Sequence, residues 1–263
     1  MEEVMRLDKY LVKEGHVSSR AKASKLILDG VVSCNGKICT SVSQEISPSD
    51  RVTVQRGAAP TFVSQGGLKL LWAIEQFGVD FRGTCVVDLG ASTGGFTDCI
   101  LQHGARFVHA IDVGTEQMDA NLRRLPNVES RENVDVRSEH GELEVDHILC
   151  DLSFISIQKI LGKIAALLPA HGSCICLIKP QFEAGKGHVN SKGIITDRAM
   201  QTQVLQEVIR SAAENGMVTV GATYSPLGGA GRNTEYLLLF RRAEAAMTGR
   251  IEMLTQRASE LLA

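Results

Sequence analysis

The sequence predicts an α/β protein in which a small α+β unit precedes a larger domain built on a mostly parallel sheet. Two observations indicate this fold class. From residue 66 onward, helical and extended patterns alternate, which is typical of a parallel sheet with helices on both faces. Before residue 56, the pattern is instead two short helices, a hairpin and a strand. The chain has 263 residues, of which 44% are hydrophobic and 22% charged, and it is long enough for one sizeable core and a small second domain.

The N-terminal elements are marked by turn and capping residues. Apolar residues recur at helical spacing before Gly15, which predicts a helix that ends there. Ser18 is a candidate N-cap for a second helix, which we expect to continue to residue 28. Asn35-Gly36 suits a two-residue type I′ turn between two extended segments, and residues 50–54 supply a further strand.

A short segment rich in small residues follows this unit. Gly57 and Pro60 lie close together there without apolar periodicity, which indicates a linker. We therefore expect a first domain at residues 1–56, a linker at 57–64 and a second domain at 65–263.

The second domain contains the alternating elements. The expected helices span residues 68–77, 96–102, 116–123, 156–167 and 197–215, and the expected strands span 84–89, 107–113, 145–150 and 173–178. Two final strands, 217–224 and 235–241, are joined by a glycine-rich segment that is too short for a crossover helix, so we expect them to pair antiparallel. An amphipathic helix is expected from about residue 244.

Membrane and export signals are not evident in the sequence. The first residues carry acids rather than a basic patch and an apolar stretch, and no apolar run approaches the ~20 residues that a spanning helix needs. We therefore expect a cytoplasmic protein without a membrane partner.

The seven cysteines do not predict a disulfide framework or a metal site. Cys85, Cys150, Cys174 and Cys176 lie in short apolar segments, where a thiol behaves as a small hydrophobe. Cys174 and Cys176 could offer two metal ligands, but no second Cys or His pair stands at zinc-finger spacing. We expect core residues and no metal.

Basic charge is concentrated at the N-terminus. The whole chain has a net charge of −2, whereas residues 1–56 hold nine Lys or Arg and seven Asp or Glu, a balance of +2 that leaves −4 for the remainder. The basic residues of the two expected helices are Arg6, Lys9, Lys13, Arg20, Lys22 and Lys25. They are candidates for RNA binding, with ordinary solvated helix faces as the alternative reading.

Residues 86–96 read as an apolar strand, a turn of small residues and the start of a helix. The pattern Asp-x-Gly-x-Ser-x-Gly-Gly differs from the G-x-G-x-x-G of dinucleotide sites and lacks the ending of a P-loop. An acid at the end of the strand suits the ammonium and sulfonium of S-adenosylmethionine better than a pyrophosphate. The candidate cofactor residues in this segment are Asp88, Gly90, Ala91, Ser92, Gly94, Gly95 and Phe96.

Two further acids are candidates for the same cofactor. Asp112 ends the next strand, where a carboxylate can accept both ribose hydroxyls of an adenosine, although a surface acid at a strand end would look the same. Asp135 is a candidate for a position near the adenine.

Seven sequence segments carry a family resemblance. They are residues 65–70, 88–98, 151–156, 178–183, 192–197, 225–227 and 233–236. Together they resemble the TlyA-type (hemolysin A) ribosomal RNA 2′-O-methyltransferases, whose catalytic domain is FtsJ-like. Residues 6–11, 19–23, 28–32 and 35–37 resemble the alpha-L RNA-binding module of the ribosomal protein S4 family. The resemblance implies a Rossmann-like class I methyltransferase sheet, S-adenosylmethionine as cofactor and the ribose of a cytidine in 16S or 23S rRNA as substrate. The sequence departs from the family at Asp135, where the family carries Asn, and this leaves the adenine contact open.

The resemblance also implies a catalytic tetrad of Lys69, Asp151, Lys179 and Glu235. The expected topology agrees with it, because Asp151 and Lys179 follow parallel strands at the carboxyl edge, where open α/β sheets bind their ligands. Glu235 begins a strand of opposite direction, so it starts at the same edge. Lys179 is the candidate base or hydroxyl-orienting group. A salt-bridge network that only stabilises this edge is the alternative reading.

Three other functions were weighed against methyl transfer. A membrane-damaging haemolysin lacks support, because no export signal, spanning segment or strongly basic amphipathic helix is evident. A non-catalytic RNA-binding assembly factor is disfavoured by the complete glycine-rich loop and tetrad. A nicotinamide enzyme is disfavoured by the loop pattern. The chain length favours the longer family type, for which the resemblance implies action on both ribosomal subunits.

Overall fold

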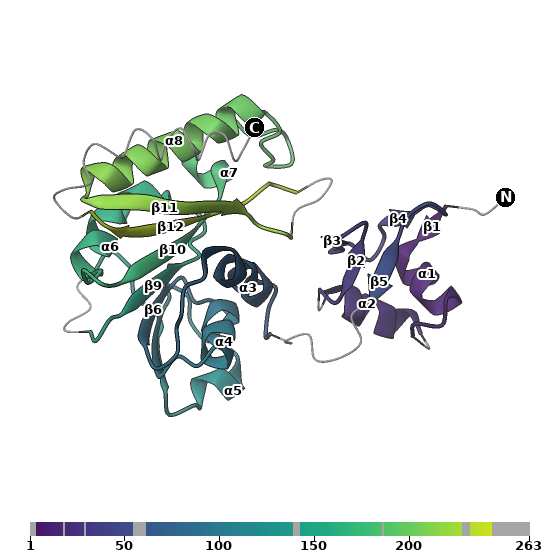
Figure 1. Ribbon diagram of the computed structural model, residues 1–263, viewed down its shortest axis with the longest axis horizontal. Coiled ribbons are helices and arrows are strands. Elements are labelled where there is room, and N and C mark those ends of the chain that lie inside the picture. The colour runs from purple at the N-terminus through teal and green to yellow at the C-terminus, as the bar shows by residue number, and fades with distance from the viewer. Residues whose placement is uncertain are drawn as a thin grey trace.

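The structure is a computed structural model. It describes residues 4–17, 19–28, 30–54, 62–138, 143–185, 187–227 and 232–243, without the side chains of residues 21, 22, 25 and 28. Figure 1 shows a smaller N-terminal unit and a larger unit that contains the main sheet. The expected boundaries at 1–56, 57–64 and 65–263 stay a prediction, since most of the linker lies outside the described residues, as do Ser18 and the helix expected from residue 244.

The N-terminal unit contains two helices and five short strands. Its elements are β1 (Met5–Arg6), α1 (Leu7–Lys13), α2 (Arg20–Leu28), β2 (Val32–Cys34), β3 (Lys37–Ile38), β4 (Glu45–Ile46) and β5 (Val52–Val54). The predicted hairpin is confirmed, because β2 and β3 pair antiparallel and both Asn35 and Gly36 have positive φ, as a type I′ turn requires. The pairing of β1 with β4 was not predicted, since two-residue strands carry no periodic signal.

The larger unit alternates helices and strands as predicted. Its elements are α3 (Gly66–Phe77), β6 (Cys85–Leu89), α4 (Gly95–Gln102), β7 (Phe107–Ile111), α5 (Ala120–Arg123), β8 (Val128–Arg131), β9 (His147–Cys150), the 3₁₀ helix η1 (Ile157–Lys159), α6 (Leu161–Leu167), β10 (Ser173–Ile178), α7 (Pro180–Glu183), α8 (Arg198–Glu214), β11 (Met217–Tyr224) and β12 (Tyr236–Arg242).

The main sheet has seven strands in the order β11-β12-β10-β9-β6-β7-β8. The five strands β10, β9, β6, β7 and β8 run parallel to one another. Strand β12 runs antiparallel to both β10 and β11. The prediction of a mostly parallel sheet with an antiparallel final strand is therefore confirmed. The carboxyl ends of the parallel strands and the start of β12 lie at one edge of the sheet.

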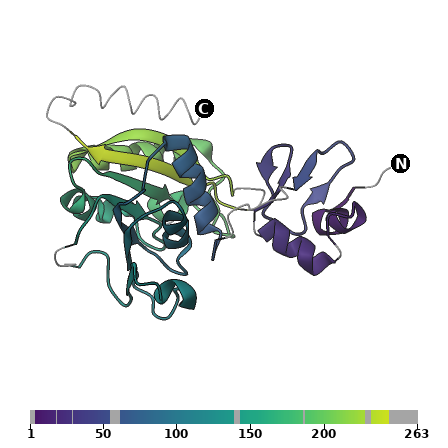
Figure 2. The same ribbon diagram turned by 60° about the horizontal axis from the view of Figure 1, so that its bottom comes forward.

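Helices cover both faces of this sheet. On one face, Val87 and Cys150 pack with Leu161 of α6 and Val204 of α8. On the other face, residues that alternate with these along the strands pack with α3 and α4. Figures 1 and 2 show the sheet between the helices from two directions. The strand residues are buried on both sides, as expected for a parallel sheet.

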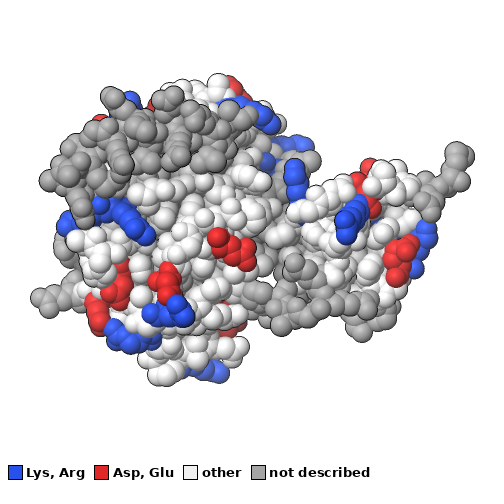
Figure 3. All heavy atoms as spheres, in the orientation of Figure 1, with Lys and Arg blue, Asp and Glu red and all other residues white. Residues whose placement is uncertain are grey.

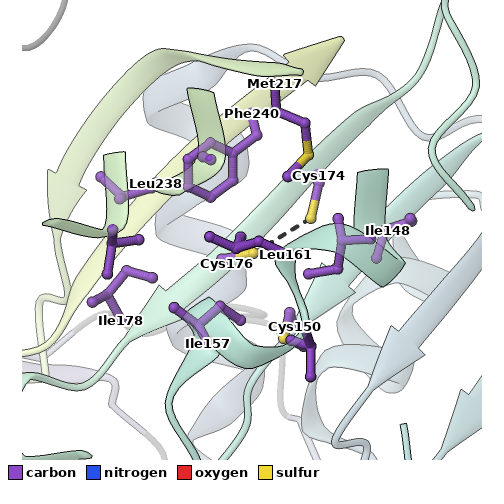
Figure 4. Packing of buried hydrophobic residues seen from close by; sticks show 14 of the residues in the cluster. Ile148, Cys150, Ile157, Leu161, Cys174, Cys176, Ile178, Met217, Leu238 and Phe240 are labelled. Carbon is purple, nitrogen blue, oxygen red and sulfur yellow. Dashed lines mark hydrogen bonds between the residues drawn. The ribbon is translucent and has the colours of Figure 1, made fainter. Parts of the chain in front are cut away.

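The cysteines are core residues, as predicted. All seven are free and buried. Cys174 and Cys176 point from β10 into the core beside Ile148 and Phe240, with their sulfur atoms 3.4 Å apart (Figure 4). Burial raises the pKa of the Cys176 thiol well above its usual value, so the thiol remains protonated inside the core.

Two local expectations need correction, and one strand was not predicted. The strand that was not predicted is β8, which lies at the sheet edge. The helix expected at 116–123 begins only at Ala120, because Asp119 caps it by accepting the Asn121 amide. The helix expected at 156–167 is divided into η1 and α6. Among the described residues, no helix is long and apolar enough to cross a membrane.

Candidate active site

Four charged residues converge at the carboxyl edge of the sheet, where the topology predicted them. Lys69 lies near the start of α3, Asp151 directly follows β9, Lys179 directly follows β10 and Glu235 directly precedes β12. They form two ion pairs: Lys179 Nζ lies 2.6 Å from Asp151 Oδ1, and Lys69 Nζ lies 2.6 Å from Glu235 Oε2. All four side chains are at least four-fifths buried.

The amine of Lys179 is held by a third residue as well. Its Nζ donates a hydrogen bond of 2.7 Å to the hydroxyl oxygen of Ser153. Sequence reasoning missed Ser153, although it stands two residues after Asp151 in a segment that it had marked. Because Lys179 has two oxygen partners and is only 9% exposed, its nitrogen is fixed at the edge of the sheet.

The loop that carries Ser153 is anchored by a buried carboxylate. Glu183 of α7 accepts hydrogen bonds from Ser156 Oγ (2.6 Å) and from the Ile157 amide (2.8 Å). Burial raises the pKa of Glu183 and outweighs the opposing effect of these hydrogen bonds. Glu183 therefore connects α7, which follows Lys179, to the loop that follows Asp151.

An aromatic side chain projects from the same loop. Phe154 is 91% exposed and has a φ of 66°, which is uncommon for a large residue. Its ring centroid lies 5.1 Å from that of Phe182 in α7. An exposed apolar ring next to Ser153 is suited to contact a ligand rather than to stabilise the core.

A pocket of about 250 Å³ lies beside the ion pairs. It is lined by Ser64, Gln65, Gly66, Lys69, Gly90, Ala91, Ser92, Thr93, Gly95, Phe96, Asp151, Ser153 and Lys179. Five of the predicted cofactor residues therefore line one pocket with three of the predicted catalytic residues. Gly90 has a φ of 86°, and a Cβ there would lie 2.7 Å from the Asp151 carbonyl oxygen, so glycine is required for this close approach.

The remaining candidates of the glycine-rich loop support the pocket from outside its lining. Gly94 caps α4 in the left-handed conformation with a φ of 93°. Asp88 is fully buried below the loop, and its Oδ2 accepts a 2.7 Å hydrogen bond from Thr97 Oγ1. Its Oδ1 has no hydrogen-bond partner among the residues that the structure describes. Burial, with a smaller contribution from the Asp151 charge, raises the pKa of Asp88 to about 7.

These features fit the cofactor that the sequence predicts. The loop presents glycine backbone where a ligand must come close, and the carboxyl group of Asp88 is buried directly below this loop, where its anion would favour a cationic ligand. A carboxyl group with a raised pKa is stabilised as the anion when a positive group binds near it.

Asp112 and Asp135 are placed differently from the loop residues. Asp112 accepts hydrogen bonds from the backbone amides of Ser92 (2.8 Å) and Gly114 (2.6 Å), so it ties the glycine-rich loop to the end of β7. Asp135 pairs with Arg137, whose Nε donates at 2.9 Å. Neither acid is among the residues that line the pocket, and their contact with a cofactor stays a prediction.

A second pocket of about 300 Å³ is lined by both members of the Lys69–Glu235 pair. It is lined by Gln65, Lys69, Gln181, Lys192, Ile194, Leu227, Arg232, Asn233 and Glu235. Gln65 and Lys69 line both pockets, which are therefore adjacent. Asn233 holds two segments of this pocket together, since its Oδ1 accepts from the Ile195 amide and its Nδ2 donates to the Gly193 carbonyl oxygen.

The candidate RNA-binding residues of the N-terminal unit are partly tied to an acid. Asp8 is buried, and it accepts hydrogen bonds from Arg6 (3.0 Å) and Arg20 (2.7 Å). Burial alone would raise the pKa of Asp8, but the two guanidinium groups outweigh it and lower the pKa. Lys9 and Lys13 are exposed on α1, and the side chains of Lys22 and Lys25 lie outside the described residues. Figure 3 shows basic and acidic side chains next to one another on the visible face.

Comparisons with known proteins agree with this arrangement. Residues 62–242 match the family model of FtsJ-like methyltransferases, and residues 5–52 match that of the S4 domain. Hemolysin A of Brachyspira hyodysenteriae is 40% identical over 240 residues, which cover 90% of this chain and 99% of that protein. The 16S/23S rRNA (cytidine-2′-O)-methyltransferase TlyA of Mycobacterium tuberculosis H37Rv is 36% identical over 239 residues, which cover 90% of this chain and 89% of that protein.

A solved structure extends the similarity to the whole fold. A protein from Streptococcus thermophilus that is named as a possible hemolysin superposes with a TM-score of 0.68 and 31% identity, covering 98% of this chain and 96% of its own. The predicted family resemblance is confirmed. The chain belongs to the TlyA/hemolysin A family and carries an S4 domain followed by an FtsJ-like methyltransferase domain.

Proposed function

We propose that this protein transfers the methyl group of S-adenosylmethionine to the 2′-hydroxyl of a cytidine in ribosomal RNA. The observation that carries the proposal is the position of Lys179 beside the cofactor pocket, where Asp151 and Ser153 hold its amine. The substrate class follows from the related M. tuberculosis enzyme, which is named for cytidine 2′-O-methylation of 16S and 23S rRNA.

The chemistry requires positioning of a weak nucleophile. S-adenosylmethionine supplies a methyl group that is already activated by its sulfonium. A ribose hydroxyl is a poor nucleophile near neutral pH, so the protein must align it and remove its proton. Asp151 and Ser153 hold the Lys179 nitrogen, and all three residues line the proposed cofactor pocket. In the proposed reaction, Lys179 serves as the base or hydroxyl-orienting group: the hydroxyl gives up its proton to Lys179 or to water, and its oxygen bonds to the methyl carbon as the methyl–sulfur bond breaks.

The second ion pair has a positioning role in this proposal. Lys69 lines both pockets, and Glu235 holds its amine at 2.6 Å. The pair therefore stands between the cofactor pocket and the second pocket, which we assign to the acceptor nucleotide. The Lys69 ammonium lies where the ribose and its phosphates would approach, and the Glu235 carboxylate keeps that ammonium in place.

Phe154 supports a single-stranded or extruded nucleotide as the substrate. Enzymes that act on a nucleotide within structured RNA take it out of its stack, and exposed aromatic side chains then stack on the unpaired base. Phe154 is exposed beside Ser153 and is supported by Phe182. The S4 domain, with Lys9 and Lys13 exposed on α1, supplies a further contact for rRNA. Because ribosomal RNA is the proposed partner, we place the reaction in the cytoplasm.

The test is methyl transfer to ribosomal subunits. Purified 30S and 50S subunits from cells that lack this enzyme are incubated with the protein and labelled S-adenosylmethionine, and the RNA is digested for mass spectrometry. The proposal predicts a 2′-O-methylcytidine in at least one subunit, with labelling of both expected for the longer family type. No label on either subunit, while the protein binds the cofactor, would support an RNA-binding assembly factor instead.

A further inference from the structure

The second pocket carries two cations that the proposed chemistry does not use. Lys192 and Arg232 both line it. Both residues are exposed, and neither has an ion-pair partner among the residues that the structure describes. Lys69, in contrast, is paired with Glu235, which is the acid among the described residues of this lining. The pocket therefore holds two positive charges that no carboxylate of its lining neutralises.

Lys192 lies in a tight turn that is held by Asn190. The Asn190 Oδ1 atom accepts hydrogen bonds from the Lys192 amide (2.9 Å) and from the Ile194 amide (3.0 Å). The Gly193 amide donates to the Asn190 carbonyl oxygen at 2.9 Å, and Gly193 has a φ of 73°. An asparagine side chain that accepts from the amide two residues onward stabilises such a turn. The backbone that carries Lys192 is therefore fixed without a ligand.

Asn233 joins this turn to the segment that carries Arg232. Its Nδ2 donates to the Gly193 carbonyl oxygen at 2.9 Å, and its Oδ1 accepts from the Ile195 amide at 2.9 Å. Gly193 directly follows Lys192, and Asn233 directly follows Arg232. One side chain thus brings two cations from distant parts of the sequence to the same pocket. Because like charges repel, this arrangement is favourable only when an anion joins them.

Phosphate is the anion that an RNA substrate brings to this pocket. It is present on both sides of the ribose that would be methylated. A guanidinium binds a phosphate through two parallel hydrogen bonds, and an ammonium acts as a point charge beside it. Such contacts fix the position of a nucleotide without reading its base. Since Lys69 lines both pockets, a nucleotide that is held in the second pocket has its ribose next to the catalytic edge.

We propose that Lys192 and Arg232 form a phosphate clamp, which binds the phosphates that flank the acceptor ribose and so positions its 2′-hydroxyl for methyl transfer. This inference rests on the proposed function. Neither residue lines the cofactor pocket, so the clamp acts in binding the RNA and not in proton transfer. Its removal should therefore raise KM for rRNA and weaken the salt dependence of binding, while kcat changes little.

The test compares a double variant that removes both charges with one that keeps them. These are Lys192→Gln with Arg232→Gln, and Lys192→Arg with Arg232→Lys. Methylation of the ribosomal subunit that wild type labels is measured at several salt concentrations, which gives kcat, KM and the slope of log kcat/KM against log salt concentration. Equilibrium binding to rRNA gives the corresponding slope without catalysis. The matched control is Lys159→Gln with Arg210→Gln, which removes two exposed charges outside the pocket.

The variant that removes both charges should lower kcat/KM by about ten- to hundredfold through KM, and its slope should be shallower by about 2. The charge-keeping variant and the control should stay within about threefold of wild type and keep its slope. Thermal unfolding of each variant shows that it is folded.

Two results would overturn the inference. One is wild-type KM and slope in the variant without the two charges. The other is an equal loss of kcat/KM in the charge-keeping variant, which would mean that packing and not charge is responsible. If wild type methylates neither subunit, the proposed function itself is removed. A shallower slope of equilibrium binding would in that case still support the contact of Lys192 and Arg232 with phosphate.

Discussion

Lys179 depends on contacts from two neighbouring segments for its position. Its backbone is fixed by the end of β10, and its amine is fixed by Asp151 and Ser153. Replacement by alanine removes the amine but leaves the cofactor loop intact. We expect Lys179→Ala to lower the methylation rate by about 10²- to 10⁴-fold, the usual contribution of a positioned proton-transfer group, while cofactor affinity changes by less than about threefold.

The measurement for this variant combines methyl transfer with calorimetric titration of S-adenosylmethionine. Lys159→Ala, at an exposed lysine of η1, is the control and should retain wild-type activity. A variant at Lys179 that is folded but loses cofactor affinity would contradict the role assigned to this residue.

Asp88 predicts a pH dependence of cofactor affinity, and the sign of this dependence follows from the burial of its carboxyl group. Its pKa is raised to about 7 in the cofactor-free protein, mainly by burial, so the carboxyl group is largely protonated below that pH. In the proposed site, the positive ammonium of a bound cofactor lies near this carboxyl group and favours its anion, so we expect binding to release a proton. We therefore expect cofactor affinity to fall as pH falls below 7, by up to about tenfold per pH unit, and to level off above it.

The corresponding experiment is cofactor titration between pH 5.5 and 7.5 for wild type and Asp88→Asn. Asparagine retains an acceptor for Thr97 but cannot release a proton. Asp88→Asn should bind the cofactor more weakly than wild type near pH 7, and its cofactor affinity should change less with pH. If the affinity of both proteins changes with pH to the same extent, Asp88 does not interact with the positive charge of the cofactor.

Residues that lie at strand ends could be predicted from sequence, and residues defined by loop contacts could not. Asp151, Lys179 and Glu235 adjoin strands whose direction follows from the helix and strand pattern, so topology alone brings them to one edge. Ser153 gains its role from the direction of its side chain in an irregular loop. Asp8 was missed for the same reason, although Arg6-x-Asp8 offered a local signal for its ion pair.

At the scale of elements, α7 is the connection between the two halves of the catalytic edge. This four-residue helix follows β10, and Glu183 at its end holds the loop that follows β9. We expect Glu183→Ala to free this loop and to lower kcat by roughly tenfold, because Ser153 and Phe154 would lose their fixed positions. Cofactor affinity should change little, since the glycine-rich loop is held separately by Asp112.

Hydrogen exchange reports this effect directly. Amides of residues 152–157 should exchange faster in Glu183→Ala than in wild type, while those of β10 keep their protection. Glu207→Ala, on the partly exposed surface of α8, is the control that should leave both regions unchanged. Unaltered exchange in residues 152–157 would show that Glu183 does not anchor the loop.

Element types were predicted better than element ends. Long periodic segments such as α8 and buried apolar segments such as β10 agree with the sequence reading to within one or two residues. The shortened α5 depends on capping by Asp119, where a side chain competes with the periodic pattern. The segment expected as one helix is divided into η1 and α6 at Ile160, whose φ of −120° is not helical. α7 was not predicted, because four residues are too few to show a period.

At the scale of the whole molecule, the proposed function assigns rRNA binding to the S4 domain and methyl transfer to the FtsJ-like domain. Lys9 and Lys13 are exposed on α1, whereas Arg6 and Arg20 are needed to neutralise the buried Asp8. We expect the double variant Lys9→Gln, Lys13→Gln to bind rRNA more weakly. The slope of log affinity against log salt concentration should become shallower by about 1 to 2, because fewer phosphate contacts release fewer counterions on binding.

Filter binding to ribosomal RNA at several salt concentrations measures this slope. Lys159→Gln, which removes one exposed positive charge outside the S4 domain, should leave the slope nearly unchanged. An identical slope for the double variant and wild type would exclude these lysines from the RNA contact.

The central claim is that the methyl group goes to the ribose oxygen and not to a base. Alkali cleaves RNA through a free 2′-hydroxyl, so a methylated 2′-oxygen protects the neighbouring phosphodiester bond. The most direct measurement is alkaline hydrolysis of rRNA that the enzyme has labelled from S-adenosylmethionine, followed by separation of mononucleotides and dinucleotides. The label is predicted in alkali-resistant dinucleotides that begin with 2′-O-methylcytidine, and it should be absent with Lys179→Ala. Label in mononucleotides would mean that a base is methylated and would contradict the proposed function.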